Sequence, residues 1–290
     1  MKIEKNEIRA LVSLLEDSDE QVIKIVSNKL KEIGIATIPY LESGLKKTNN
    51  KNHKLKINRL LREFKISRLA LEIKNWKEHD EADLLKGLIT IAKYGQEQVD
   101  EDAIYASILE IEKAITSKIE LNNNTDLIEI LNEVILKEFN FKANLDINKG
   151  ANASYINKVL EYKSGYPIML CAIYLLMAQK FNIPLIGINS PRHFILAYIG
   201  NNINTKTAMP DILMKNVLYF LDPYLQGSIY QAEDFKKLLK ASQFDMIFFS
   251  NLAASNTDIL KRVINNVTHS IYTDGKENTA KRLLKIAEEL

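Results

Sequence analysis

The stretch GYPIMLCAIYLLMAQKFNIPLIGI, residues 165–188, decides the fold class of this chain. Gly165, Tyr166 and Pro167 interrupt a preceding helical pattern, and residues 168–181 are then apolar on nearly every side. A helix of that kind belongs inside a protein core. After the break at residues 182–184, a short apolar segment at residues 185–188 has strand character. We therefore expect a buried central helix that leads directly into a sheet.

Two further segments with strand character follow, at residues 194–199 and 217–221. The polar residues between them are typical of a hairpin turn and a loose loop. Consecutive strands without an intervening helix favour an antiparallel sheet in an α+β fold. Because most of the remaining chain has helical periodicity, the predicted fold is a mainly helical α+β protein with a small antiparallel sheet.

The N-terminal part consists of short amphipathic runs. Apolar residues recur at helical spacing from Ile8 to Leu15 and from Val22 to Ile33, where Gly34 is placed to end the helix. Two further runs follow, at residues 35–45 and 55–66, so the four runs form at most two helix pairs. This order resembles the HEAT-type helical repeat, but it is shorter than the three or more repeats that usually make a solenoid stable.

The C-terminal part predicts a helical hairpin, with helices at residues 256–272 and 277–290 around a Thr-Asp-Gly turn. Its length is about that of one tetratricopeptide unit. We therefore divide the chain into a HEAT-like arm (1–66), a core with its preceding helices (67–250) and a tetratricopeptide-like hairpin (251–290).

Composition narrows the function classes. The 290 residues are 46% hydrophobic and 26% charged, and the net charge of +2 is too small to indicate nucleic-acid or membrane binding by bulk charge. The longest apolar run, residues 168–178, is shorter than the roughly 20 residues that a membrane-spanning helix needs. The first residues alternate in charge and lack the apolar core of a signal peptide. We therefore expect a soluble, cytoplasmic protein.

Neither a metal nor a cofactor is expected. A single cysteine, Cys171, excludes an internal disulfide and a multi-cysteine metal site. His53, His79 and His269 lie in polar contexts without ligand spacing, and we interpret them as surface residues. Glycine-rich phosphate loops are absent from the sequence.

One stretch is strongly basic. Residues 46–65 carry eight Lys or Arg residues against Glu63 alone. This is the only hint of nucleic-acid binding, and aromatic residues do not alternate with the basic ones as they do in single-strand binding grooves. We favour a solvated helix face.

Three central residues suggest nucleophilic chemistry: Cys171, His193 and Asp222. Such chemistry needs a thiolate, an imidazole that deprotonates it and a carboxylate that orients the imidazole. His193 begins one predicted strand and Asp222 ends the next, so both can emerge from the same edge of a sheet. A lone histidine beside apolar residues is nevertheless more often structural.

Several motifs resemble the bacterial SirB-type branch of the transglutaminase-like superfamily: NASYINKVL (152–160), GYPI (165–168), IYL (173–175), SPRHF (190–194) and LDPY (221–224). The resemblance covers about residues 80–290. It implies a papain-like core, with the nucleophile at the amino end of the central helix, a histidine on one strand and an aspartate on the next. His193 and Asp222 match the last two positions. For Arg192 we weigh an anion contact against an exposed side chain without a role, and favour the latter.

The nucleophile position departs from the pattern of active relatives. Counted back from the Asn-Ile-Pro at residues 182–184, it holds Pro167. Cys171 lies four residues later, on the same helix face but about 6 Å further along the axis. A catalytic thiol must come within hydrogen-bond reach of its imidazole, and the positive end of a helix acts only over its first turn. The apolar neighbours of Cys171 predict a buried, inert thiol.

The leading hypothesis is therefore a non-catalytic transglutaminase/protease-like protein. In it, His193 and Asp222 persist as a relict pair, and the chain acts as an interaction or regulatory module that binds another protein through helical surfaces. The alternative is a cysteine hydrolase or acyltransferase, of peptidase or amidase type if it cleaves, that uses Cys171, His193 and Asp222.

Overall fold

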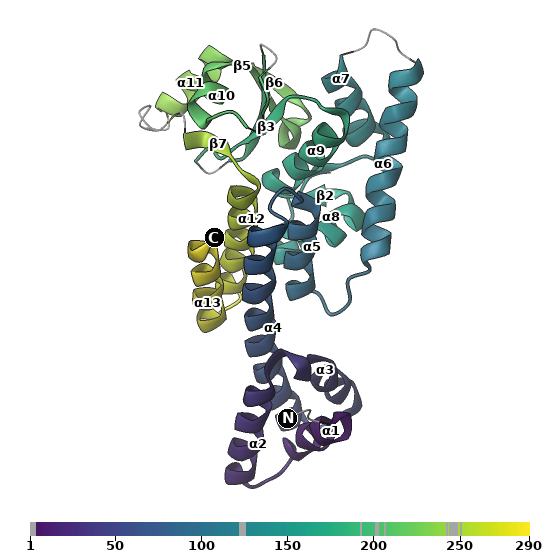
Figure 1. The fold of residues 1–290 in the computed structure, drawn as a ribbon, viewed down its shortest axis with the longest axis vertical. Coiled ribbons are helices and arrows are strands. Elements are labelled where there is room, and N and C mark those ends of the chain that lie inside the picture. Colours follow the sequence, from purple (N-terminus) through teal and green to yellow (C-terminus); the bar gives the residue numbers. More distant parts are fainter. Residues whose placement is uncertain are drawn as a thin grey trace. The chain divides into compact units, whose positions relative to one another are not determined.

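The computed structural model describes residues 4–121, 126–191, 193–200, 203–205, 207–241, 243, 249 and 251–290. Arg192, and with it the anion contact weighed above, lies outside these residues. The chain forms two compact units, Met1–Lys74 and Asn75–Leu290, and each is described by itself below (Figure 1). The predicted boundaries at residues 66 and 250 stay predictions.

The first unit is helical, with α1 (Lys5–Leu14), α2 (Glu20–Ile33), the 3-10 turn η1 (Gly34–Thr37), α3 (Ile38–Lys47) and the first part of α4 (Lys51–His79). The Asp19 side chain caps α2 by accepting from the Gln21 backbone N–H, and Gly34 ends it with a φ of 74°. Apolar side chains from all four helices form one core. The helix predicted at residues 55–66 is the middle of α4, which continues without a break to His79.

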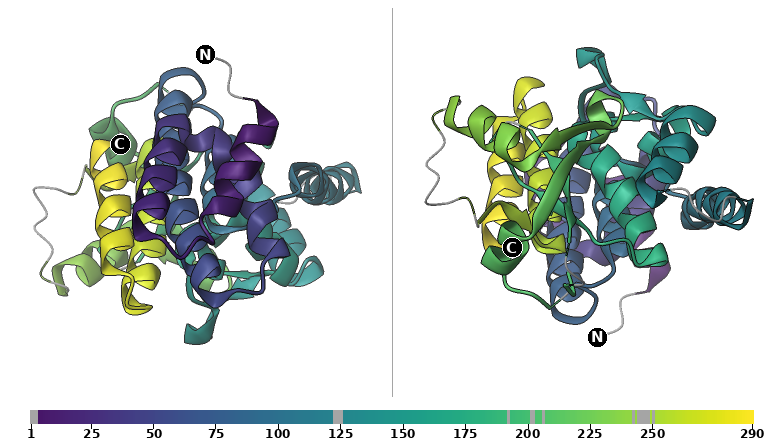
Figure 2. Two further views of the ribbon diagram at one scale, coloured as in Figure 1. Left: turned by 90° about the horizontal axis from the view of Figure 1, so that it is seen from below. Right: turned by 90° about the horizontal axis from the view of Figure 1, so that it is seen from above.

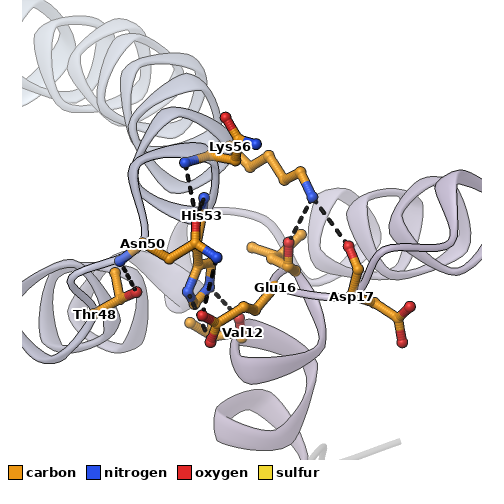
Figure 3. A network of polar contacts seen from close by, with 9 residues as sticks. Val12, Glu16, Asp17, Thr48, Asn50, His53 and Lys56 are labelled. Atoms are coloured by element: carbon orange, nitrogen blue, oxygen red, sulfur yellow. Dashed lines mark hydrogen bonds and ion pairs between the residues drawn. The ribbon is translucent and has the colours of Figure 1, made fainter.

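Polar contacts hold the start of α4 against the C-terminal end of α1 (Figure 3). His53 Nε2 lies 3.0 Å from the Val12 carbonyl oxygen, so this nitrogen carries the proton. Lys56 Nζ donates to the carbonyls of Leu15 (3.0 Å) and Asp17 (3.3 Å). Donors and positive charge stabilise the end of a helix, where carbonyls lack partners within the helix.

This network corrects one prediction. His53 is 4% exposed and not a surface residue, because its ring provides a partner for a carbonyl 41 residues away in the sequence. Lys56 also donates to carbonyls at the C-terminal end of α1. Lys65 forms an ion pair with Glu42, with 2.9 Å between Nζ and Oε1. Part of the basic stretch at 46–65 is therefore used within this unit.

The second unit begins with the end of α4 and continues with further helices. Trp76 is buried and donates from Nε1 to the Asp83 carbonyl at 2.8 Å. The helical elements that follow are α5 (Leu84–Gly95), α6 (Glu101–Leu121), α7 (Leu127–Leu131), the π-helix η2 (Asn132–Glu138), η3 (Ile147–Ser154), α8 (Ile156–Tyr162), α9 (Pro167–Phe181), α10 (Pro210–Lys215), η4 (Pro223–Leu225), α11 (Ala232–Ala241), α12 (Asn256–Thr273) and α13 (Glu277–Glu289).

The sheet of this unit has five antiparallel strands in the order β6-β5-β4-β3-β7. Their bounds are β3 (Leu185–Ile188), β4 (Ile195–Ile199), β5 (Val217–Asp222), β6 (Ser228–Gln231) and β7 (Ala253–Ala254). A separate parallel pair joins β1 (Lys142–Ala143) to β2 (Ser164–Gly165). The predicted mainly helical α+β fold with an antiparallel sheet is confirmed, and β6 and β7 add edge strands that the sequence pattern did not indicate.

Helix α9 is the centre of the core. Every residue from Ile168 to Ala178 is buried, and the helix contacts β3, β4, η4 and α12. Asn182 ends it in the left-handed conformation, with a φ of 52°. Helices α12 and α13 lie side by side as a hairpin (Figures 1 and 2), with a Ser255–Asp258 capping box at its start. Within the described residues, none of the helices combines the length and the hydrophobicity needed to cross a membrane.

Candidate functional site

The antiparallel pairing of β4 and β5 brings His193 and Asp222 together. Leu196 pairs with Leu221 in the ladder, so the residues just before β4 meet the end of β5 at one edge of the sheet. There His193 Nε2 lies 2.7 Å from Asp222 Oδ2. A neutral ring that donates from Nε2 carries its accepting lone pair on Nδ1.

The Asp222 carboxylate is fixed by further hydrogen bonds. Its side chain is 2% exposed, against 34% for that of His193. Oδ1 accepts from the backbone N–H groups of Tyr224 (3.0 Å) and Leu225 (3.3 Å), so Asp222 caps η4 while its other oxygen holds the imidazole. A buried charge needs such partners, and here they also fix the orientation of His193.

Tyr224 is a site residue that the sequence pattern contained within LDPY but did not single out. Its ring meets the His193 ring edge to face, with centroids 5.9 Å apart. Its hydroxyl donates to the Asn144 carbonyl at 3.0 Å. Burial, followed by the charges of Tyr166 and Asp222, raises the pKa of the Tyr224 phenol. Tyr224 therefore stays protonated and supports one side of the imidazole.

Cys171 lies in the second turn of α9 and is completely buried. Its Sγ–H donates to the Phe194 carbonyl at 3.4 Å. Burial, followed by the negative charge of Asp222, raises the pKa of this thiol well above its usual range. The nucleophilic form of cysteine is the thiolate, and this environment disfavours it.

Pro167 is the first residue of α9, and Tyr166 precedes it as the N-cap in an extended conformation. Proline suits this position because its missing N–H would have had no partner within the helix. The side chain is half-buried and lines a cavity. The start of the central helix, where the resemblance places a nucleophile, therefore holds a residue without a reactive atom.

The rest of the described chain offers no cluster of three or more His, Cys, Asp or Glu side chains suited to a metal ion. His79 and His269 are exposed. The groups available for chemistry at the sheet edge are thus one imidazole, one carboxylate and one phenol. They can bind or orient a ligand and can move a proton.

A model of the transglutaminase-like superfamily matches residues 101–265. Among curated proteins, the chain is 24% identical over 142 residues to F-box only protein 21 of Mus musculus. This alignment covers 44% of the present chain and 22% of that protein. The chain is also 25% identical over 167 residues to a UPF0162 protein of Xylella fastidiosa strain Temecula1, and that alignment covers 54% of each protein. The chain thus spans about a fifth of the length of the F-box protein and about half of the length of the UPF0162 protein. None of the solved structures matches it significantly.

Proposed function

The chain belongs to the transglutaminase-like superfamily, and we propose that it is a non-catalytic member that acts as a protein-interaction or regulatory module. The observation that carries the proposal is the occupant of the first position of α9, which is Pro167. From the SPRHF and LDPY motifs we further infer that the chain belongs to the SirB-type branch of this superfamily.

The position of the only thiol supports the proposal. One turn separates Cys171 from the start of α9, a displacement of about 6 Å along the axis. Nucleophile and base must come within about 3 Å of each other. The thiol instead has a carbonyl as its acceptor and no exposed surface. Catalysis at Cys171 would require the loss of that hydrogen bond and the opening of the core around α9.

In this proposal His193 and Asp222 have a structural and binding role. The pair links β4, β5 and η4 at one edge of the sheet, and His193 remains partly open to solvent. The partner is another protein, bound through the helices of the first unit or through the α12–α13 hairpin. Paired helices of both kinds resemble repeats that offer such surfaces.

The alternative is a cysteine hydrolase or acyltransferase. Two observations favour it: Cys171 Sγ is hydrogen-bonded to the residue that follows His193, and the charge of Asp222 reaches the thiol. All three groups thus lie in one region of the second unit. In this alternative, exposure of the thiol would accompany substrate binding.

Acyl capture distinguishes the two. We expect that 4-nitrophenyl acetate leaves Cys171 unmodified in the native protein, because a buried and protonated thiol does not attack an ester. Intact-mass and peptide analysis locates any acetyl group, and ester hydrolysis is followed in parallel. The Cys171→Ser and His193→Ala variants should behave as the wild type does. A stoichiometric acetyl group on Cys171 that disappears in His193→Ala would establish the enzyme alternative instead.

A further inference from the structure

A cavity of about 400 Å³ lies between the start of α9 and the tail helix α12. One wall is polar and comes from a single helix, with the residues Arg262, Asn266, His269, Ser270 and Thr273. The rest of the lining is mostly apolar, with Pro167, Ile168 and Phe194 beside Tyr166 and Gly150. We call this space the α12 cavity. Because Pro167 and Tyr166 line it, whereas His193 and Asp222 do not, the cavity adjoins the start of α9 and does not include the sheet-edge pair.

The polar wall follows from helical spacing. Arg262, Asn266, Ser270 and Thr273 are separated by four, four and three residues, and side chains at such separations share one face of a helix. The adjacent stripe of α12 is buried and apolar, with Val263, Ile264 and Val267. The polar stripe therefore faces the cavity and does not simply cover a solvent-exposed side of the tail.

Arg262 is a half-buried cation. Its Nη1 donates to the neutral Asn189 Oδ1 at 3.0 Å, and no carboxylate of the described chain forms an ion pair with it. Burial lowers the pKa of the guanidinium from its usual range. Taking a charge out of water is costly unless an opposite charge compensates it. A bound anion would supply that compensation.

Ser270 adds a second polar group to the cavity lining. The residue is 9% exposed, it lines the cavity, and its hydroxyl has no hydrogen-bond partner among the residues that the structure describes. The hydroxyl oxygen is not fully buried but reaches the open space of the cavity, where it can donate to a ligand. The hydroxyl lies close to Gly150, where an added Cβ would come within 3.1 Å of Ser270 Oγ. The start of α9 adds the positive end of a 15-residue helix.

We propose that the α12 cavity binds a small organic anion, in which a carboxylate or phosphate group is joined to an apolar body. The oxyanion binds Arg262 and Ser270, with the Asn266 amide within the same polar wall. The apolar body packs against Ile168 and Phe194. The cavity volume falls within the range of about 300–1,000 Å³ that is usual for small-molecule sites. This site is independent of any chemistry at Cys171.

Calorimetry on the full chain tests the proposal with benzoate and phenyl phosphate as probes. We expect each to bind once per chain, with a dissociation constant below about 1 mM. Neutral benzamide, which keeps the ring and loses the charge, should bind at least about tenfold more weakly because it cannot form the charge-assisted hydrogen bonds. Inorganic phosphate, which lacks the apolar body, should also be the weaker ligand. The ratio of benzoate to phenyl phosphate affinity then tells which head group the site prefers.

Variants assign the binding to this cavity. Arg262→Gln should weaken benzoate about tenfold or more, and Arg262→Lys should weaken it less, since it keeps the charge but loses the planar fork. Arg282→Gln, an exposed position on α13, removes the same charge elsewhere and should have no effect. Far-ultraviolet circular dichroism checks that each variant is folded.

Two results would overturn the proposal. One is the absence of saturable binding by both aromatic anions to the wild type. The other is benzoate binding that Arg262→Lys and Arg262→Gln leave unchanged or that Arg282→Gln weakens equally. Acyl capture at Cys171 would have no bearing on either result, so failure here is distinguishable from failure of the non-catalytic proposal.

Discussion

Pro167→Cys, made in a Cys171→Ser background, is expected to create a thiol that ionises well below pH 8.5. The first position of α9 lies at the positive end of a 15-residue helix. Cysteines at helix N-termini or beside an imidazole have pKa values of about 3.5–7.5, against about 8.5 for a free cysteine. Serine at position 171 keeps a donor for the Phe194 carbonyl, so the core should remain intact.

The pH dependence of alkylation measures this effect better than the rate at one pH. A thiol of lower pKa has a larger thiolate fraction, but its intrinsic nucleophilicity falls as well, so the two effects partly cancel. We expect the iodoacetamide rate profile to have its midpoint at about pH 6–7. The matched control is His193→Gln in the same background, which should move the midpoint upward. A midpoint near 8.5 that does not depend on His193 would mean that Pro167 does not occupy the nucleophile position.

Asp222→Ala is expected to destabilise the second unit by about 2–4 kcal/mol. The substitution removes the acceptor of three hydrogen bonds, from His193 Nε2 and from the backbone N–H groups of Tyr224 and Leu225. Asp222→Asn keeps an oxygen for the two N–H groups of η4, and its amide can donate to the other tautomer of the imidazole. It should therefore cost less, about 1–2 kcal/mol.

The fluorescence of Trp76 reports on this unfolding. It is the only tryptophan of the chain, it is buried, and it belongs to the second unit. Urea titration gives the free energy of unfolding of that unit. The control Asp211→Asn, at an exposed position of α10, should change it by no more than about 0.5 kcal/mol. Equal effects of Asp222→Ala and Asp211→Asn would show that the pair contributes nothing to the fold.

The central part of the fold could be predicted because its signals are local. Residues 168–178 are apolar on all sides, and a helix with that composition is stable only when it is buried in a core. Strands β3, β4 and β5 are apolar runs bounded by turns. Strand β6 could not be predicted, because Ser228–Gln231 is mostly exposed and lacks the alternation of buried and exposed residues that marks a strand. Strand β7 could not be predicted because it is only two residues long.

The parts of the candidate site that could be predicted are those that depend on residues close together in the sequence. His193 and Asp222 stand at the ends of recognisable strands, and the burial of Cys171 follows from its neighbours. The surroundings of Tyr224 and His53 depend on the carbonyls of Asn144 and Val12, far away in the sequence. No local pattern reports such contacts. The polar residues of α12 at positions 262, 266, 270 and 273 were not singled out from the sequence, because only the fold shows that the start of α9 lies across a cavity from them.

The most direct test of the account is the rate at which iodoacetamide alkylates Cys171 in the native wild-type protein, compared with the rate in urea. A thiol buried in the centre of α9 reacts only when the core opens. We therefore predict a native rate at least about a thousandfold below the unfolded rate, and no change in His193→Ala. Fast native alkylation with a profile centred below pH 8.5 and lost in His193→Ala would contradict the account, since Cys171 would then be an activated nucleophile.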